Sequence, residues 1–319
     1  MNIKSIIQYL LPYIKNFRIF SFLINLIDYR INIIILKKKE VVRKVNNYPM
    51  VLSFHEKGIS HGLFINRVRE IAETEILKEI LKPGMCILEI GANIGYYTIL
   101  MGKIIGKTGK IYLYEPYFPS FKILMKNIKL NNISTIVEAN NLAVSNETKI
   151  KKFYLGKASN VHSLINYSSN TNNPNYIKVK TIDINEVLRN INRKIDLLRM
   201  DIEGHEREIF KRLSKDNIHF LPKRIFFEIH PIGDIHPDPT FKSPLSNILN
   251  LGYFPELVVS SSNVNAYKRF KNLNYHPFKI VGNVHNRRYL YKNIKRCDLL
   301  KIAASRPKMT RAVLLKLKE

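Results

Sequence analysis

The sequence predicts an α/β fold with a doubly wound, mainly parallel sheet, an antiparallel edge strand and basic terminal extensions. Two observations predict it: short apolar runs alternate with helical patterns between residues 85 and 229, and a glycine-containing turn follows the first of those runs. Strands that alternate with helices of this length are typical of a parallel sheet covered by helices. A chain of 319 residues, 45% of them hydrophobic, is large enough to bury such a sheet.

The expected elements follow in chain order. Residues 51–54, with Gly58 and Gly62 as turn residues, form a hairpin-like lead-in. Strands are expected at 85–90, 110–114, 135–138, 150–155, 195–200 and 224–229, and helices at 68–81, 94–105, 118–130, 205–213 and 244–251. The Asn- and Ser-rich residues 159–175 are expected to form a long loop, and the apolar run 254–259 is expected to pair antiparallel at the sheet edge.

Lysine and arginine outnumber aspartate and glutamate by 52 to 25, which gives a net charge of +27. Residues 1–50 hold nine basic and two acidic residues, and residues 287–319 hold eleven and two, so the ends of the chain carry most of the excess. We therefore expect a basic, apolar-rich N-terminal extension (1–50), a central domain with every motif (51–260) and a basic C-terminal extension (261–319). The extensions are expected to meet an anionic surface or partner.

The first residues form a basic amphipathic pattern, with apolar residues at helical spacing from Ile3 to Phe17 beside Lys4, Lys15 and Arg18. This pattern fits a helix that lies on a membrane surface, and it fits a helix that packs on the main domain, which is the interpretation we favour. Charged residues interrupt every apolar stretch, so no spanning helix is expected. Two cysteines are too few for a disulfide framework and favour a cytoplasmic location, with the membrane surface as the alternative.

The turn after the first expected strand reads LEIGANIGYYT over residues 88–98. In open α/β sheets, ligands bind at this kind of strand-to-helix turn. A dinucleotide site has the pattern G-x-G-x-x-G after the strand, but Asn93 and Tyr96 occupy the places of its second and third glycines. Glu89 would repel phosphates and can accept hydrogen bonds from an ammonium group. The turn therefore favours a zwitterionic ligand, for which S-adenosylmethionine is the foremost candidate.

A second carboxylate closes the next expected strand. Glu115 follows residues 110–114 and stands 24 positions after Gly91. A carboxylate at this place can accept hydrogen bonds from both hydroxyls of a ribose. The glycine turn and this carboxylate together favour a nucleoside ligand.

Three motifs resemble those of the FkbM-type methyltransferases: residues 83–98 with LEIGANIGYYT, YEP at 114–116, and IDLLRMDIEGHEREIF at 195–210. These are class I, Rossmann-like enzymes that transfer a methyl group from S-adenosyl-L-methionine, typically to a hydroxyl of a sugar, glycan or secondary metabolite. The resemblance implies that the residues of the first motif that bind the methionine part are Glu89, Gly91, Asn93 and Gly95. It also implies that Glu115 holds the ribose and that residues 141–144, Ala143 among them, border the adenine.

Acidic residues and histidines follow the strands expected beside this turn. Methyl transfer needs close alignment of donor and acceptor, and a hydroxyl acceptor needs a general base. We expect the catalytic residues to be Asp201, His205, Glu228 and His230. Glu228 and His230 are two positions apart and so point to the same side of their strand. With Asp201 they form either a base and its orienting partner or, less favoured because no ligand spacing supports it, a divalent-metal site.

Other interpretations accompany these predictions. Glu228 has a purely structural alternative to its catalytic role, as a buried and hydrogen-bonded residue. RNA ribose methylation and a non-catalytic cofactor-binding protein at a membrane surface are the functional ones. Base-amine methylation is disfavoured, because such enzymes carry an Asn/Asp-Pro-Pro-aromatic run where this chain reads MDIEG at 200–204. The expected partners are a small-molecule or glycan hydroxyl and an anionic membrane surface that contacts the basic termini, and nucleic acid is not expected.

Overall fold

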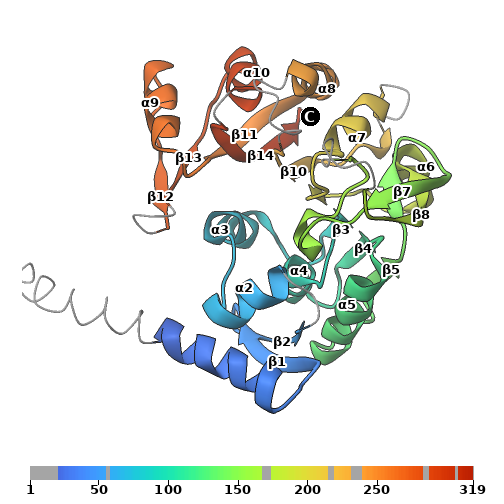
Figure 1. Cartoon of the computed structure of the whole chain (residues 1–319). Coiled ribbons are helices and arrows are strands. Elements are labelled where there is room, and N and C mark those ends of the chain that lie inside the picture. The colour runs from blue at the N-terminus through green and yellow to red at the C-terminus, as the bar shows by residue number, and fades with distance from the viewer. Residues whose placement is uncertain are drawn as a thin grey trace, which may run out of the picture. The chain divides into compact units, whose positions relative to one another are not determined.

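The computed structural model describes residues 21–54, 58–166, 174–214, 219–230, 239–282, 287–305 and 308–318 (Figure 1). The chain divides into two compact units, Met1–Arg69 and Glu70–Glu319. One boundary, after residue 69, therefore stands in place of the two that were expected at residues 50 and 260. The helical pattern of residues 3–17 lies outside the described residues.

The first unit consists of a helical segment, a hairpin and a second helix. Its elements are residues 21–30 (helix), η1 (Ile31–Ile35), β1 (Glu40–Val45), β2 (Tyr48–Ser53) and α2 (Ile59–Asn66). β1 and β2 pair antiparallel around Asn46 and Asn47, which both have positive φ, as tight hairpin turns require. The expected run 51–54 thus ends the second strand of a hairpin that turns at residues 46–47, and not at Gly58 or Gly62 as predicted. Gly62, expected in a turn, lies inside α2, because the apolar residues around it, Leu63 and Phe64, are buried in the unit.

Within the described residues, the second unit is built on a nine-stranded sheet in the order β12-β13-β11-β14-β10-β9-β3-β4-β5 (Figure 1). Its strands are β3 (Cys86–Ile90), β4 (Lys110–Tyr114), β5 (Val137–Asn140), β9 (Leu197–Met200), β10 (Arg224–Glu228), β11 (Tyr253–Ser260), β12 (Lys279–Val281), β13 (Arg288–Tyr291) and β14 (Thr310–Leu317). The helices are α3 (Ile71–Ile80), α4 (Tyr96–Ile105), α5 (Phe118–Leu130), α6 (Ile184–Asn190), α7 (Glu206–Arg212), α8 (Pro239–Asn250), α9 (Val264–Asn272) and α10 (Arg296–Ala303).

The half of the sheet that carries the motifs is parallel and doubly wound. β10, β9, β3, β4 and β5 all run in the same direction. From β3 the chain proceeds to β4 and β5 on one side and later returns to β9 and β10 on the other. The order therefore reverses between β3 and β9, and in open α/β sheets this switch point is where ligands bind.

β3 is buried on both faces, as expected for a central parallel strand. Cys86, Leu88 and Ile90 pack into the hydrophobic cluster formed with α6, α7, α8 and α10. Successive side chains of a strand point to opposite faces, so Glu89 points to the other face, where Thr98 of α4 meets it. This buried acid is the first sign that the site is built partly inside the protein.

The C-terminal part of the chain completes the sheet. β14 lies between β10 and β11 and pairs antiparallel with both, and residues 312–315 are all buried. Residues 261–319 were expected to form a basic extension outside the domain. Instead, they contribute strands to its main sheet. The sequence conceals this pairing because β14 lies far along the chain from β10 and has lysines and arginines on either side. The run 254–259 lies in β11 and pairs antiparallel as predicted, but β13 and β12 continue the sheet beyond it.

The chain between β5 and α6 forms a separate small sheet. It consists of β7 (Ile150–Tyr154), β8 (Tyr176–Asp183) and β6 (Ala143–Ser145), with β8 in the middle. The strand expected at 150–155 thus exists outside the main sheet, and β8 and α6 were not predicted. Of the loop expected at 159–175, residues 159–161 form a 3-10 turn, η2 (Ser159–Val161), and residues 167–173 are not described.

Leu315 tests the position of β14. It is fully buried and pairs with Ile225 of β10 and Pro255 of β11. We expect Leu315→Ala to lower the free energy of unfolding by about 2–5 kcal/mol, measured by urea denaturation. The control Met125→Ala, on the exposed side of α5, is expected to change it by less than about 1 kcal/mol. Equal losses in the two variants would contradict a central place for β14.

Candidate functional site

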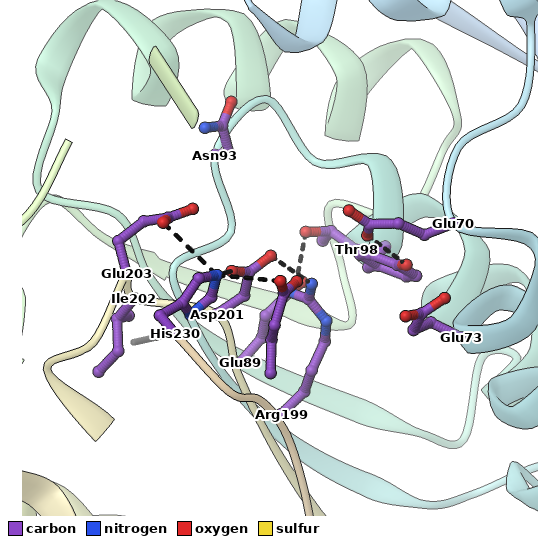
Figure 2. Close-up of polar contacts among 12 residues, drawn as sticks. Glu70, Glu73, Glu89, Asn93, Thr98, Arg199, Asp201, Ile202, Glu203 and His230 are labelled. Carbon is purple, nitrogen blue, oxygen red and sulfur yellow. Dashed lines mark hydrogen bonds and ion pairs between the residues drawn. The ribbon is translucent and has the colours of Figure 1, made fainter. Parts of the chain in front are cut away.

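The predicted site residues lie around the carboxyl ends of β3, β4, β9 and β10, beside the switch point. Figure 2 shows Asp201, Glu203 and His230 pointing toward one another, with Arg199 and Glu89 next to them and Asn93 on the loop above. The sheet therefore brings together residues that are more than 100 positions apart in the sequence.

The loop after β3 approaches the loop after β9 very closely. Gly91 has φ +83°, and a Cβ on it would lie 2.2 Å from the backbone oxygen of Asp201. Gly95, at the start of α4, has φ +91°, and a Cβ there would lie 2.7 Å from Leu124 of α5. A side chain at either position would therefore collide with the protein itself and strain the backbone. The two glycines therefore allow the loop to pack closely on the loop after β9 and on α5.

Glu115 organises the part of the site at the end of β4. Its carboxylate accepts hydrogen bonds from the backbone amides of Asn93 and Tyr117, both at 2.8 Å. The side chain of Asn141 donates to the backbone oxygen of Glu115 at 2.8 Å, which places the start of β6, with the buried Ala143, beside it. Asn93, Glu115 and the segment 141–143 are therefore neighbours, as predicted.

Glu89 lies inside the protein, beneath the glycine loop. Thr98 donates to its carboxylate at 2.6 Å and Arg199 contacts it at 3.3 Å, and the residue has no exposed surface. Burial raises the pKa of Glu89, and the charge of Arg199 opposes that shift. The sequence predicted a direct contact with an ammonium group. In the structure this carboxylate holds Thr98 of α4 and Arg199, and its contact with the cofactor stays a prediction.

Arg199 was not predicted, and it connects the two sides of the site. It lies on β9, and its guanidinium reaches Glu89 at 3.3 Å and Asp201 at 3.2 Å while stacking on the ring of Tyr97, 3.9 Å from the centroid. A planar guanidinium suits this combination of two carboxylates and an aromatic face. The signal available in the sequence was an arginine inside the otherwise apolar strand LLRM.

His230 stands among four carboxylates. Its Nε2 lies 3.1 Å from Glu228, 3.4 Å from Glu203 and 3.7 Å from Asp201, and its Nδ1 lies 3.4 Å from Glu206. Burial lowers the pKa of His230, but the charges of Glu228 and Glu203 outweigh burial and hold that pKa well above its usual value. The neighbouring carboxylates thus favour the protonated imidazole. Asp201, Glu228 and His230 come together as the sequence predicted.

His205 does not join this cluster. Its Nε2 lies 3.0 Å from the hydroxyl of Ser145 in β6, and Lys151 donates to the same hydroxyl at 2.7 Å. His205 is the N-cap residue of α7, so its contact with Ser145 connects α7 to the small sheet. Burial, followed by the charge of Lys151, lowers the pKa of His205 to about 4, so the ring is neutral. The side chain of His205 is thus directed at Ser145 and not at His230, and a catalytic role for it stays a prediction.

A second arginine supports the other end of the cluster. Arg311 of β14 contacts Glu70 at 2.8 Å and Glu73 at 3.4 Å, and it also pairs with Glu228. Tyr97 donates to Glu70 at 2.7 Å. Burial, with the neighbouring Glu70, raises the pKa of Glu73 to about 7. Glu228 was predicted as a site residue, whereas Arg311, Glu70 and Glu73 were not, because they lie outside the motifs.

Two sets of side chains within the described residues could hold a metal ion. Asp201, Glu203 and His230 offer ligand atoms within 4.8 Å of one another, and so do Glu70, Asp201 and Glu228. A cation in the first set would have to displace the proton of His230, since metals bind the neutral imidazole. In the second set it would compete with Arg311. The geometry thus favours ion pairs among the protein's own groups.

Comparison with known families settles what these motifs belong to. Residues 89–255, just over half of the chain, match the family model of the methyltransferase FkbM domain. The chain belongs to the FkbM methyltransferase family. S-adenosyl-L-methionine is therefore its cofactor, and the doubly wound sheet is the class I fold that the resemblance implied.

Individual relatives of this FkbM family member cover it unevenly. The protein-L-isoaspartate O-methyltransferase of Methanosarcina mazei is 37% identical over 84 residues, which are 25% of this chain and 34% of that protein. The match thus spans about a third of that relative's length. Similar solved structures include M. jannaschii TYW2 in complex with AdoMet (14% identity, 88% of each chain, TM-score 0.41). Another is an O-methyltransferase from Bacillus cereus in complex with SAH (11% identity, 78% of this chain and 82% of that one, TM-score 0.38).

Gly91 gives a first test of the site. We expect Gly91→Ala to lower the free energy of unfolding by at least about 2 kcal/mol and to weaken S-adenosylmethionine binding, because the new Cβ meets the backbone of Asp201 at a positive φ. Urea denaturation and calorimetric titration measure the two effects. The control is Gly62→Ala in α2, where no atom lies within 4 Å of the new Cβ and stability is expected to rise by about 0.5–1 kcal/mol. Similar behaviour of the two variants would contradict the close approach.

His205 gives a test by pH. Its folded pKa of about 4 lies below the usual value of 6.5, so the unfolded chain binds a proton first as the pH falls, and stability is lost between pH 6.5 and 4. Between pH 7 and pH 5, we expect the wild type to lose about 2 kcal/mol more unfolding free energy than His205→Gln. Urea denaturation at the two pH values measures the difference. If the unfolding free energies of the wild type and His205→Gln fell equally between pH 7 and pH 5, His205 would be exposed or charged in the folded protein.

Proposed function

We propose that this FkbM methyltransferase transfers a methyl group from S-adenosyl-L-methionine to a hydroxyl of a sugar, glycan or secondary metabolite. The position of Asp201 carries the proposal. Its backbone abuts the glycine loop after β3, its carboxylate contacts Arg199, and its Oδ1 lies 3.7 Å from His230. A partly exposed carboxylate at this place stands beside the cofactor loop, where an acceptor hydroxyl needs a base.

The loop residues fit the cofactor. Asn93 and Gly95 lie on the tightly packed turn at the start of α4, beside the carboxyl ends of β3 and β4. A carboxylate has about four acceptor sites, so Glu115 can bind ribose hydroxyls in addition to the amides of Asn93 and Tyr117. We assign the methionine part to residues 91–95, the ribose to Glu115 and the adenine to the border formed by residues 141–143. When bound, the cofactor supplies a methyl carbon on a positively charged sulfur.

Asp201 is the general base of this proposal. Its side chain is 20% exposed, whereas those of Glu89 and Glu228 are almost fully buried. The guanidinium of Arg199 lies 3.2 Å from this carboxylate, and the imidazole of His230 lies 3.7 Å from it. As the acceptor oxygen takes up the methyl group, its proton passes to the Asp201 carboxylate. His230 suits the role of base less well, because the neighbouring carboxylates favour its protonated form.

His230 and Glu228 are positioning residues in this account. Glu228 is paired with Arg311 and His230, and Lys308 lies 3.6 Å away. His230 in turn fixes the position of Asp201 through its charge. Of the two arrangements expected from the sequence, we favour a base with its orienting partner over a metal site. Asp201 is the base and His230 orients it.

Asp201→Asn tests the assignment. We expect turnover to fall by about 10²–10⁴-fold, because the amide cannot take the proton, while the affinity for S-adenosylmethionine changes little. The control Glu138→Gln replaces an exposed carboxylate of β5 and is expected to keep both. A tritiated methyl donor and calorimetric titration provide the two measurements. Equal loss of affinity and turnover in Asp201→Asn, or full turnover, would contradict the proposed role.

The acceptor class is tested with the wild-type protein. Labelled S-adenosylmethionine is incubated with a panel of sugars and glycans and, separately, with total RNA. We expect label on glycan or sugar hydroxyls. Label on RNA ribose alone would overturn the acceptor class but leave Asp201 as the base. Cofactor binding without any transfer from the panel or a cell extract would favour the binding protein over the enzyme.

A further inference from the structure

The helical residues 21–35 of the first unit turn an apolar face to solvent. The exposed side chains are large and range from 39% to 70% exposed: Phe22, Leu23, Ile24, Ile27, Ile31, Ile34, Ile35 and Leu36. Five of them, at positions 24, 27, 31, 34 and 35, follow the three- and four-residue spacing of one helical stripe. We call this set of eight residues the apolar face. An exposed stripe of this size marks a contact surface rather than a scatter of single residues.

The opposite side of the same segment faces the unit's own fold through polar groups and through the Tyr29 ring, which packs against Phe54 and Phe64. Asn25 donates to the backbone oxygen of Ile65 at 3.0 Å and accepts from Arg67 at 3.1 Å. Asp28 pairs with Arg43 and accepts from Asn32 at 2.7 Å. The segment is thus held to its unit by hydrogen bonds and by the Tyr29 ring, while the eight residues of the apolar face stay exposed. A surface helix usually turns its polar side outward, so this outward apolar face calls for a partner.

Basic residues accompany the apolar face. Lys37, Lys38 and Lys39 follow it directly, and Arg30 lies within it. The sole acidic residue between positions 21 and 39 is Asp28, whose charge is already paired with Arg43. An apolar helical face bordered by lysines matches the two layers of a bilayer surface, acyl chains and anionic headgroups.

We propose that the apolar face and Lys37–39 dock this enzyme on an anionic lipid bilayer, with the helix lying in the plane of the interface. No helix among the described residues is long and apolar enough to cross a membrane. A second copy of the chain fits less well, because two such segments side by side would bring their lysines together. This surface is separate from the methyl-transfer chemistry, and its failure leaves the proposed function untouched.

Vesicle sedimentation with the full chain tests the proposal. We expect binding to phosphatidylcholine vesicles with 30 mol% phosphatidylserine and much weaker binding to pure phosphatidylcholine. Ile34→Glu with Ile35→Glu should abolish binding, while the control pair Ile150→Glu with Ile280→Glu, equally exposed in the second unit, should retain it. S-adenosylmethionine affinity, measured on each variant, confirms that the catalytic unit is folded.

A second pair of variants separates a local site from the overall charge of +27. At low ionic strength, replacing Lys37, Lys38 and Lys39 by alanine should weaken vesicle binding by about 100-fold, from about 1 kcal/mol for each lysine near the surface. Replacing the exposed α5 residues Lys122, Lys126 and Lys129 by alanine removes the same charge and should have little effect. Equal losses in the two triple variants would overturn the docking site. So would the absence of vesicle binding, or a dimer that dissociates in Ile34→Glu with Ile35→Glu while vesicle binding persists.

Discussion

The site depends on one buried guanidinium. Arg199 reaches Glu89 under the cofactor loop and Asp201 at its side, and its plane lies on the ring of Tyr97. Without it, two carboxylates from neighbouring strands would face each other in an environment that stabilises charge poorly. Removing one partner of a buried ion pair is far more costly than the pair's net contribution, because the remaining charge loses its compensation. The position of Asp201, the proposed base, and that of the glycine loop are thus set by the same group.

The same principle extends along the strand ends. Arg311 balances Glu70, Glu73 and Glu228, and the imidazolium of His230 balances the carboxylates on the other side. This balance requires β14, which begins at residue 310 and lies between β10 and β11. The second unit therefore closes its acidic site with a residue supplied from near the far end of the chain. A fold that lacked β14 would leave at least three carboxylates near β10 without their cation.

Local pattern predicted much of the fold. β3, β4, β10, α4 and α5 follow from apolar runs and glycine turns, and Gly91, Asn93 and Glu115 lie at one sheet edge because parallel strands end together. Long-range pairing was not predictable: β14 pairs with strands that lie tens of residues away, and its basic neighbours gave it the composition of a tail. His205 was misplaced because the start of α7 sets its direction, and Arg199 was overlooked because its partners become visible only when β3 and β9 are side by side.

A double-mutant cycle of Glu89→Gln and Asp201→Asn, measured by urea denaturation, tests the role of Arg199 most directly. Each single variant leaves the guanidinium one carboxylate, whereas the double variant leaves it none. The account predicts that the double variant loses about 1–3 kcal/mol more unfolding free energy than the two single losses combined, and that this excess disappears in an Arg199→Met background. Additive losses with Arg199 present would contradict it.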